Sequence, residues 1–358
     1  MQNPDDPPPK SPYDPEETPE EELWFLPDPE VGEAERDQGA NLPWPVADRE
    51  RGDAGAWQGA ERTLAVALAR AAGAFGALDD RLKRVHRGIR ERAVLMQVAE
   101  LSWQLGDRLS ADRIALYLAA RITRAGDDMP AFARAGWAMR RLSDGQPIST
   151  DGLADLLGRA TLDDATARDL VDRPQGAEFA ALEERFWSSL SDLAESHPIT
   201  RGAYAWHLWH QLDLSGEAAR IEGAVVAAKI GAGTPRGARE GAGFLPFAGI
   251  PMAGSVEARL SSFYQGAETQ CLRMLMELDR IAAWEARATA AVSDLSGRTP
   301  ALLITAFANW PMLSAEALEQ QTGASRAAVQ RNLNRLADRD LIREVTGQGR
   351  FRMWAARV

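Results

Sequence analysis

Residues 299–358 read TPALLITAFANWPMLSAEALEQQTGASRAAVQRNLNRLADRDLIREVTGQGRFRMWAARV, and their pattern decides the fold. The apolar segment 301–307 predicts a helix, and Ser314 is placed to begin a second, shorter helix. Gly323 predicts a tight turn after it, because glycine adopts positive φ angles without steric cost. Two short strands are expected on either side of residues 346–350. This order of elements is typical of a winged helix-turn-helix, which most often reads duplex DNA in the major groove.

The third predicted helix follows Ser325, whose hydroxyl is suited to accept a hydrogen bond from a free N–H of the first turn. Val329, Leu333 and Leu336 lie at spacings of four and three, so they share one face that packs on the other helices. The opposite face is polar, and Arg and Gln side chains make paired hydrogen bonds with base edges. The predicted DNA-binding residues lie at the start and on the exposed side of this helix and in the expected strand hairpin. They are Ser325, Arg326, Ala327, Gln330, Arg331, Asn334, Arg335, Gln348 and Arg350.

The preceding part of the chain has helical periodicity and almost no β-branched alternation. We therefore expect a mainly α protein, with an all-helical body at residues 60–297 and a C-terminal winged helix-turn-helix at 298–358. Residues 256–295 contain no proline and repeat apolar positions, which predicts one unusually long helix or two helices joined near Gly266. The sequence at 296–300 predicts the end of this segment and a hinge.

The net charge of −11 is distributed unevenly along the chain. Residues 1–60 contain sixteen Asp or Glu and four Lys or Arg, whereas residues 299–358 contain eight Arg and five Asp or Glu. The acidity therefore belongs to the N-terminal part, and the C-terminal module carries +3. Residues 1–59 are also rich in proline, so they predict a disordered tail. Its two apolar islands, at 23–26 and 42–46, either lie across the body or dock a partner.

Several classes of protein are excluded by simple observations. Cys271 is the single cysteine, so there is no intramolecular disulfide and no cysteine-rich zinc module. No apolar run is long enough to span a bilayer, and the N-terminal sequence has no features of a secretory signal. We expect a cytoplasmic protein, associated with the nucleoid and without contact to membranes.

No arrangement of residues predicts catalysis or a cofactor. His207 and His210 are spaced like metal ligands on a helix, but no third ligand is indicated, and aromatic neighbours favour histidines of the core. The glycines between 231 and 243 follow no strand, so they do not form a phosphate-binding loop. The chain is predicted not to be an enzyme and to hold no metal.

The run SRAAVQRNLNRLADRDLIREVTGQGRFRMWAA, residues 325–356, resembles the winged helix at the C-terminus of many Fic-type proteins. It more closely resembles a family of uncharacterised helix-turn-helix proteins, often plasmid-borne, of rhizobia and related alphaproteobacteria. In that family a helical domain of unknown function precedes the module. The body segments that are similar to the family are 68–82, 99–122, 134–142 and 284–303.

The resemblance implies DNA binding for residues 314–354 and no activity for the body. A Fic active site needs a His-Pro-Phe sequence followed by a Gly-Asn-Gly-Arg loop. This chain has His197-Pro198 without such a loop, so nucleotidyl transfer is not expected.

We predict a sequence-specific protein that binds double-stranded DNA, either a transcription regulator or a plasmid-maintenance factor. Two alternatives remain open. In the first, the winged helix docks a protein partner. In the second, the protein is a regulator that senses a ligand in a pocket among its tryptophan-rich helices. Because one module reads few base pairs, we also expect a homodimer, formed through the apolar stripe from Leu260 to Val292.

Overall fold

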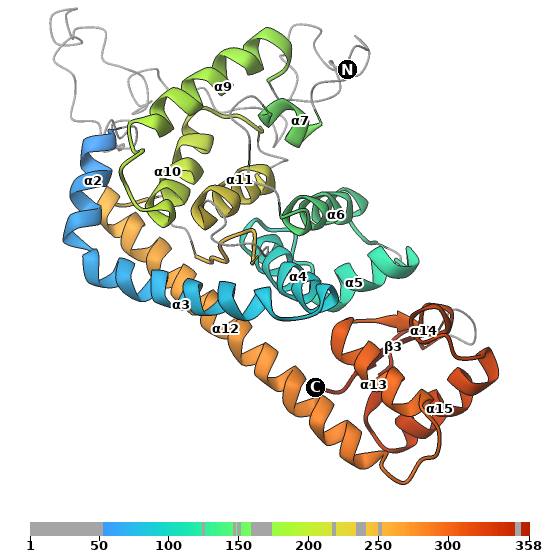
Figure 1. The fold of residues 1–358 in the computed structure, drawn as a ribbon. Coiled ribbons are helices and arrows are strands. Elements are labelled where there is room, and N and C mark those ends of the chain that lie inside the picture. Colours follow the sequence, from blue (N-terminus) through green and yellow to red (C-terminus); the bar gives the residue numbers. More distant parts are fainter. Residues whose placement is uncertain are drawn as a thin grey trace, which may run out of the picture. The chain divides into compact units, whose positions relative to one another are not determined.

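The computed structural model describes residues 53–123, 126–145, 148, 152–158, 174–216, 220–233, 241–249, 253–347 and 352–358. The two apolar islands and most of the predicted tail lie outside these residues, as do Gln348 and Arg350. Residues Arg49–Val358 form one compact unit. The prediction of a mainly α protein is confirmed, because helices make up most of this unit and the strands form one small sheet (Figure 1).

The described part of the body is built from helices that precede residue 292. They are α2 (Ala54–Thr63), α3 (Ala65–Lys83), α4 (Arg87–Gln104), α5 (Ala111–Ala120), α6 (Met129–Ser143), α7 (Leu153–Leu157), α9 (Gly176–Ser191), α10 (Pro198–Gln211), α11 (Ile221–Ala232) and α12 (Val256–Ala291). Helices α10 and α11 pack closely at the centre, because Gly202 faces the backbone of Gly231. A Cβ atom at residue 202 would lie 2.8 Å from that backbone.

The predicted tail is too long at its C-terminal end. Helix α2 begins at Ala54, and the Asp53 carboxylate accepts a hydrogen bond from the Gly55 N–H at 2.9 Å. Trp57 is fully buried, with its ring centroid 5.4 Å from that of Tyr204 and 5.2 Å from that of His207. The burial of this one large side chain stabilises a helix that local composition does not predict.

Helix α12 is one continuous helix of 36 residues, so the alternative of two helices joined near Gly266 is wrong. At Gly266 the backbone of the loop after α11 approaches closely, and a Cβ atom would clash with the Ala248 carbonyl oxygen. The glycine therefore permits close packing and does not end the helix.

The apolar stripe of α12 is covered by the chain itself. Leu260, Phe263 and Cys271 are fully buried in the core of the body, where α12 lies along α3 (Figure 1). Burial also raises the pKa of the Cys271 thiol to about 12, as expected for a small core residue. The predicted dimer interface is therefore wrong, because an apolar repeat shows that a face is buried but not what covers it. Homodimerisation itself stays a prediction.

The C-terminal module contains α13 (Thr299–Asn309), β1 (Leu313–Ser314), α14 (Ala315–Thr322), α15 (Arg326–Asp338), β2 (Ile342–Glu344) and β3 (Met353–Ala356). The strands form an antiparallel sheet in the order β1-β3-β2. The sequence predicts the three helices and both strands of the hairpin, and these are confirmed. Strand β1 was not predicted, because two residues carry no periodic signal.

Strand β3 of this small sheet is buried on both faces, whereas Arg343 of β2 is exposed. Trp354 packs in a core with the helices of the module, and Ile281 and Trp284 of α12 belong to the same core. The residue before Trp354 in the strand, Met353, belongs to the core of the body. Because successive residues of a strand point to opposite faces, the sheet lies between the module's helices and the body. The Trp284 indole also donates to the Leu341 carbonyl at 3.0 Å.

Arg92 of α4 joins the body to the end of α13. Its Nη2 donates to the carbonyl oxygens of Phe307, at 2.6 Å, and Trp310, at 2.5 Å. These carbonyls belong to the last turn and the C-cap of α13, where the helix itself supplies no donor. Burial lowers the pKa of Arg92 to about 10, which leaves it charged at neutral pH, and Glu277 and Asp112 oppose the shift.

Replacing Arg92 by alanine is expected to lower the free energy of unfolding by about 1.5–3 kcal/mol, because two carbonyls lose a charged donor. Urea denaturation followed by circular dichroism would measure this. Arg84→Ala is a matched control, since Arg84 forms an exposed ion pair with Asp80 at 2.8 Å and its loss should cost less than about 1 kcal/mol. Equal effects of the two replacements would show that Arg92 does not hold the two parts together.

Candidate nucleic-acid interface

The turn between α14 and α15 is set by local hydrogen bonds. Gly323 ends α14 with a φ of 65°, and its N–H donates to the Glu319 carbonyl at 2.9 Å. The Ser325 hydroxyl then caps α15 by accepting from the Ala328 N–H at 3.4 Å. Both features agree with the sequence analysis. They fix the direction in which α15 leaves the turn.

One face of α15 is buried and the other is exposed. Val329, Leu333 and Leu336 are fully buried against the helices of the module. The predicted DNA-contacting residues of this helix all lie on the exposed side, and they are Ser325, Arg326, Ala327, Gln330, Arg331, Asn334 and Arg335. The structure therefore brings together on one surface every predicted contact that it describes.

The arginines of this surface form no ion pair with a described carboxylate, although the charge of Arg335 contributes to the lowered pKa of Asp294. Residues 325–335 contain three arginines and no Asp or Glu. In the described parts of the chain, no carboxylate lies within ion-pair distance of Arg326, Arg331 or Arg335. Their guanidinium groups are consequently available to an anionic ligand without first breaking an ion pair.

Other arginines of the module are engaged within the chain. Arg343 pairs with Asp112 of the body at 2.9 Å, and Arg357 pairs with Asp340 at 2.9 Å. Arg352, which the sequence analysis did not select, is exposed and lies over the Trp354 ring at 4.5 Å. This contact could have been predicted from the Arg-x-Trp sequence, because residues two apart in a strand point to the same side.

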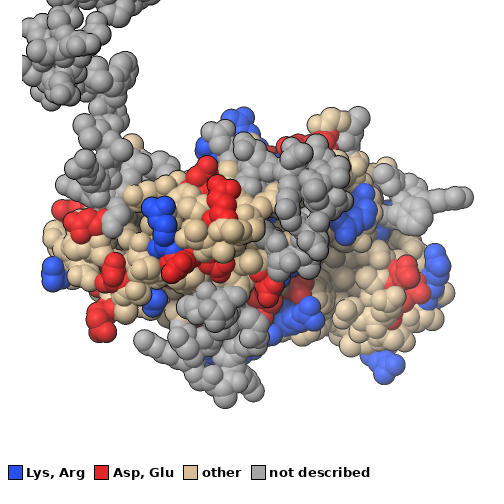
Figure 2. Space-filling view, turned by 90° about the horizontal axis from the view of Figure 1, so that it is seen from above, with Lys and Arg blue, Asp and Glu red and all other residues tan. Residues whose placement is uncertain are grey.

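Charge alone does not single out a surface. Figure 2 shows one face of the molecule, on which basic and acidic side chains are interspersed without a broad area of one sign. The case for α15 therefore depends on particular side chains and not on the net charge of −11.

Arg339 ties the end of α15 to the segment after α12. Its two terminal nitrogens donate to the two oxygens of Asp294 at 2.6 and 2.7 Å, and Nη1 also donates to the Ala291 carbonyl. The hydrogen bond from Arg339 lowers the pKa of Asp294 from 3.8 to about 2. A paired, charged Asp294 thus holds α15 against the end of α12.

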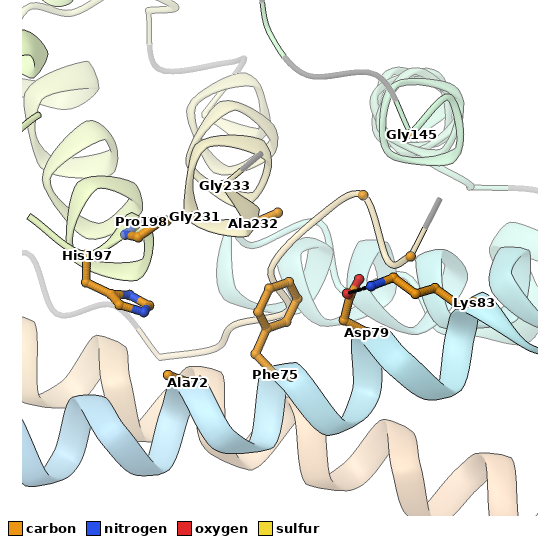
Figure 3. Close-up of a pocket in the computed structure, with 13 residues that line it drawn as sticks. Ala72, Phe75, Asp79, Lys83, Gly145, His197, Pro198, Gly231, Ala232 and Gly233 are labelled. Carbon is orange, nitrogen blue, oxygen red and sulfur yellow. Dashed lines mark ion pairs between the residues drawn. The ribbon is translucent and has the colours of Figure 1, made fainter. Parts of the chain in front are cut away.

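The body contains a separate cavity of about 490 Å³ (Figure 3). Phe75 and Asp79 rise into it from α3, and His197 reaches it from the start of α10. Asp79 is already engaged, because one oxygen accepts from the Ala242 N–H at 2.8 Å and the other pairs with Lys83 at 2.8 Å. No tryptophan is found among the described residues that line this cavity, so it is not the ligand pocket that the sequence analysis offers among the tryptophan-rich helices.

The two histidines with metal-like spacing point to different surroundings. His207 is buried beside Trp57, and His210 Nδ1 lies 2.8 Å from the Trp206 carbonyl oxygen. Burial lowers the pKa of His210, which favours its neutral form. Across the described ranges, no cluster of three His, Cys, Asp or Glu is arranged to hold a metal ion. Likewise, no helix in those ranges combines the length and apolarity needed to cross a membrane.

Comparison with known proteins adds little to this geometry. No protein-family model matches the chain, and no curated protein matches it. Among solved structures, a Fic family protein from Desulfovibrio desulfuricans G20 is similar, with 12% identity over 81% of this chain and 95% of that chain. The TM-score is 0.35, which is too low to support an argument about fold or function. The resemblance to the alphaproteobacterial family therefore stays a prediction.

The pair formed by Asp294 and Arg339 predicts a specific pH dependence. Because the folded pKa of Asp294 is depressed, its stabilising contribution is present above about pH 4 and is lost as the pH falls towards 2. Asp294→Asn should lower the urea midpoint at pH 7, and the difference from the unaltered chain should shrink below pH 4. A difference of the same size at pH 7 and pH 2 would contradict this assignment.

Proposed function

We propose that the C-terminal module is a winged helix-turn-helix and that the protein binds duplex DNA in a sequence-specific manner. In this proposal α15 is the reading helix, and the protein acts as a transcription regulator or in plasmid maintenance. The observation that carries the proposal is the exposed face of α15. It presents three arginines that form no ion pair with a described carboxylate, together with two amide side chains, while Val329, Leu333 and Leu336 on the opposite face are fully buried.

The order of elements supports this assignment. Helices α14 and α15 are joined by a short turn at Gly323, and the β2–β3 pair follows α15 as the strands of a wing would. Helix α15 has 13 residues, which corresponds to about 20 Å, and an α-helix fits the major groove of B-DNA. Arginines would neutralise phosphates, so binding should weaken as salt is added.

Protein docking is the competing use of the same surface. A helix that docks in a protein groove presents apolar anchors at spacings of three and four. The exposed positions of α15 are instead Arg, Gln, Asn, Ser and Ala between residues 325 and 335. The large exposed apolar residues among those described lie on other elements, for example Met276 on α12 and Trp103 on α4. This distribution favours a nucleic acid over a protein as the ligand of α15.

The proposal extends to the rest of the chain in three respects. The body supports and orients the reading helix and has no catalytic role. The protein works in the cytoplasm, at the nucleoid. Two copies bind adjacent half-sites, through a surface other than the buried stripe of α12, because a single module gives limited discrimination in a genome.

The direct test replaces Arg326, Gln330 and Arg331 together by alanine. The tagged chain should enrich discrete sequences from sheared genomic DNA. The triple variant should lose this enrichment, because it lacks an amide that can contact a base edge, worth about 1–3 kcal/mol of discrimination, and two arginines that can contact phosphates. Circular dichroism would establish that the variant is folded.

The matched control replaces two exposed arginines and one exposed glutamine on helices other than α15, at Arg84, Gln104 and Arg280. This control should enrich the same sequences as the unaltered chain. The proposal fails if the unaltered chain enriches no sequence, or if a folded α15 variant enriches the same sites equally well.

A further inference from the structure

The exposed face of α15 has two amide side chains along its middle. Gln330 and Asn334 are one helical turn apart, so they lie one above the other on the same face. With 100° of rotation per residue, Arg326 lies to one side of this pair and Arg331 to the other. Ala327 is also on this face, and its methyl group is too small to prevent close approach of a base to the helix. The amides therefore occupy the part of the helix that would approach base edges most directly.

The two amides contact each other. Gln330 Nε2 lies 3.5 Å from Asn334 Oδ1 and donates to it. This contact uses one of the two N–H groups of Gln330 and turns its nitrogen towards Asn334. One N–H and the carbonyl oxygen of Gln330 remain, side by side, for a ligand. Asn334 thus determines which hydrogen-bonding groups Gln330 presents.

We infer that Gln330 reads an adenine in the major groove and that Asn334 is the residue that positions it; this inference rests on the proposed function. Adenine presents N7 as an acceptor beside the N6 amino donor. The free N–H of Gln330 matches N7, and its carbonyl oxygen matches the amino group. Guanine presents two acceptors, O6 and N7, so the Gln330 oxygen would face an oxygen with no hydrogen between them.

Arg326 and Arg331 have a different task in this arrangement. They flank the amides on the two sides that would face the walls of the groove, where the phosphates run. Guanidinium groups there add affinity for any duplex and carry no sequence information directly. The discrimination at the centre of the half-site is assigned to Gln330.

The test selects bound duplexes from a random pool with the full-length protein and then sequences them. The expected motif contains one position where adenine is preferred over each other base by about 5- to 150-fold. Gln330→Glu should change that position to cytosine and leave the others unaltered, because a carboxylate accepts from the cytosine amino group. Gln330→Ala should remove the preference at that position and retain binding.

Further variants test the positioning role. Asn334→Ala should weaken the adenine preference, whereas Asn334→Asp should restore it, since a carboxylate also accepts from Gln330. A purely structural role of Asn334 would leave the base preference unchanged. Gln265→Glu on α12, an exposed glutamine that donates to Ser261 in a similar one-turn contact, is the matched control and should leave the motif intact.

The outcomes separate this inference from the proposed function. If the unaltered chain selects no motif, sequence-specific DNA binding itself is overturned. If it selects a motif that is unchanged in both Gln330→Glu and Gln330→Ala, or changed only at a position without adenine, DNA binding stands and the assignment of Gln330 is overturned.

Discussion

One helix belongs to both hydrophobic cores of the described chain, and the arrangement of the rest depends on it. The first part of α12 buries Leu260, Phe263 and Cys271 in the body, and its last turns bury Trp284 and Ala288 in the C-terminal module. A helix is stiff over this distance because every turn is held by backbone hydrogen bonds. The two cores are consequently held at a spacing set by the helix, and a break in it would leave them joined through contacts that include those of Arg92, Arg343 and β3.

Local signals were sufficient to predict much of the module and parts of the body. Ser314 and Ser325 each accept a hydrogen bond at a helix start, where their sequence positions predicted caps. The buried face of α15 follows from spacing alone. These features could be predicted because a cap or an amphipathic face involves residues within about one turn of each other.

Features that depend on distant partners could not be predicted. Nothing near Trp57 in sequence indicates that Tyr204 and His207 cover it, and nothing near Arg92 indicates that it binds the end of α13. The candidate site shows the same limit. Arg335 and Arg339 look alike in sequence, but Asp294, 45 residues before Arg339, engages only the latter in hydrogen bonds among the described residues.

The burial of strand β3 on both faces has a consequence for how such a module is inherited. A domain that is exchanged between genes as a cassette needs a surface that is polar on every side. Here the face that carries Met353 is covered by the body, and the core around Trp354 is completed by α12. A copy moved to another protein without these partners would expose apolar side chains and lose part of its core. Helix α15 and the body are therefore expected to change together, as one evolving unit.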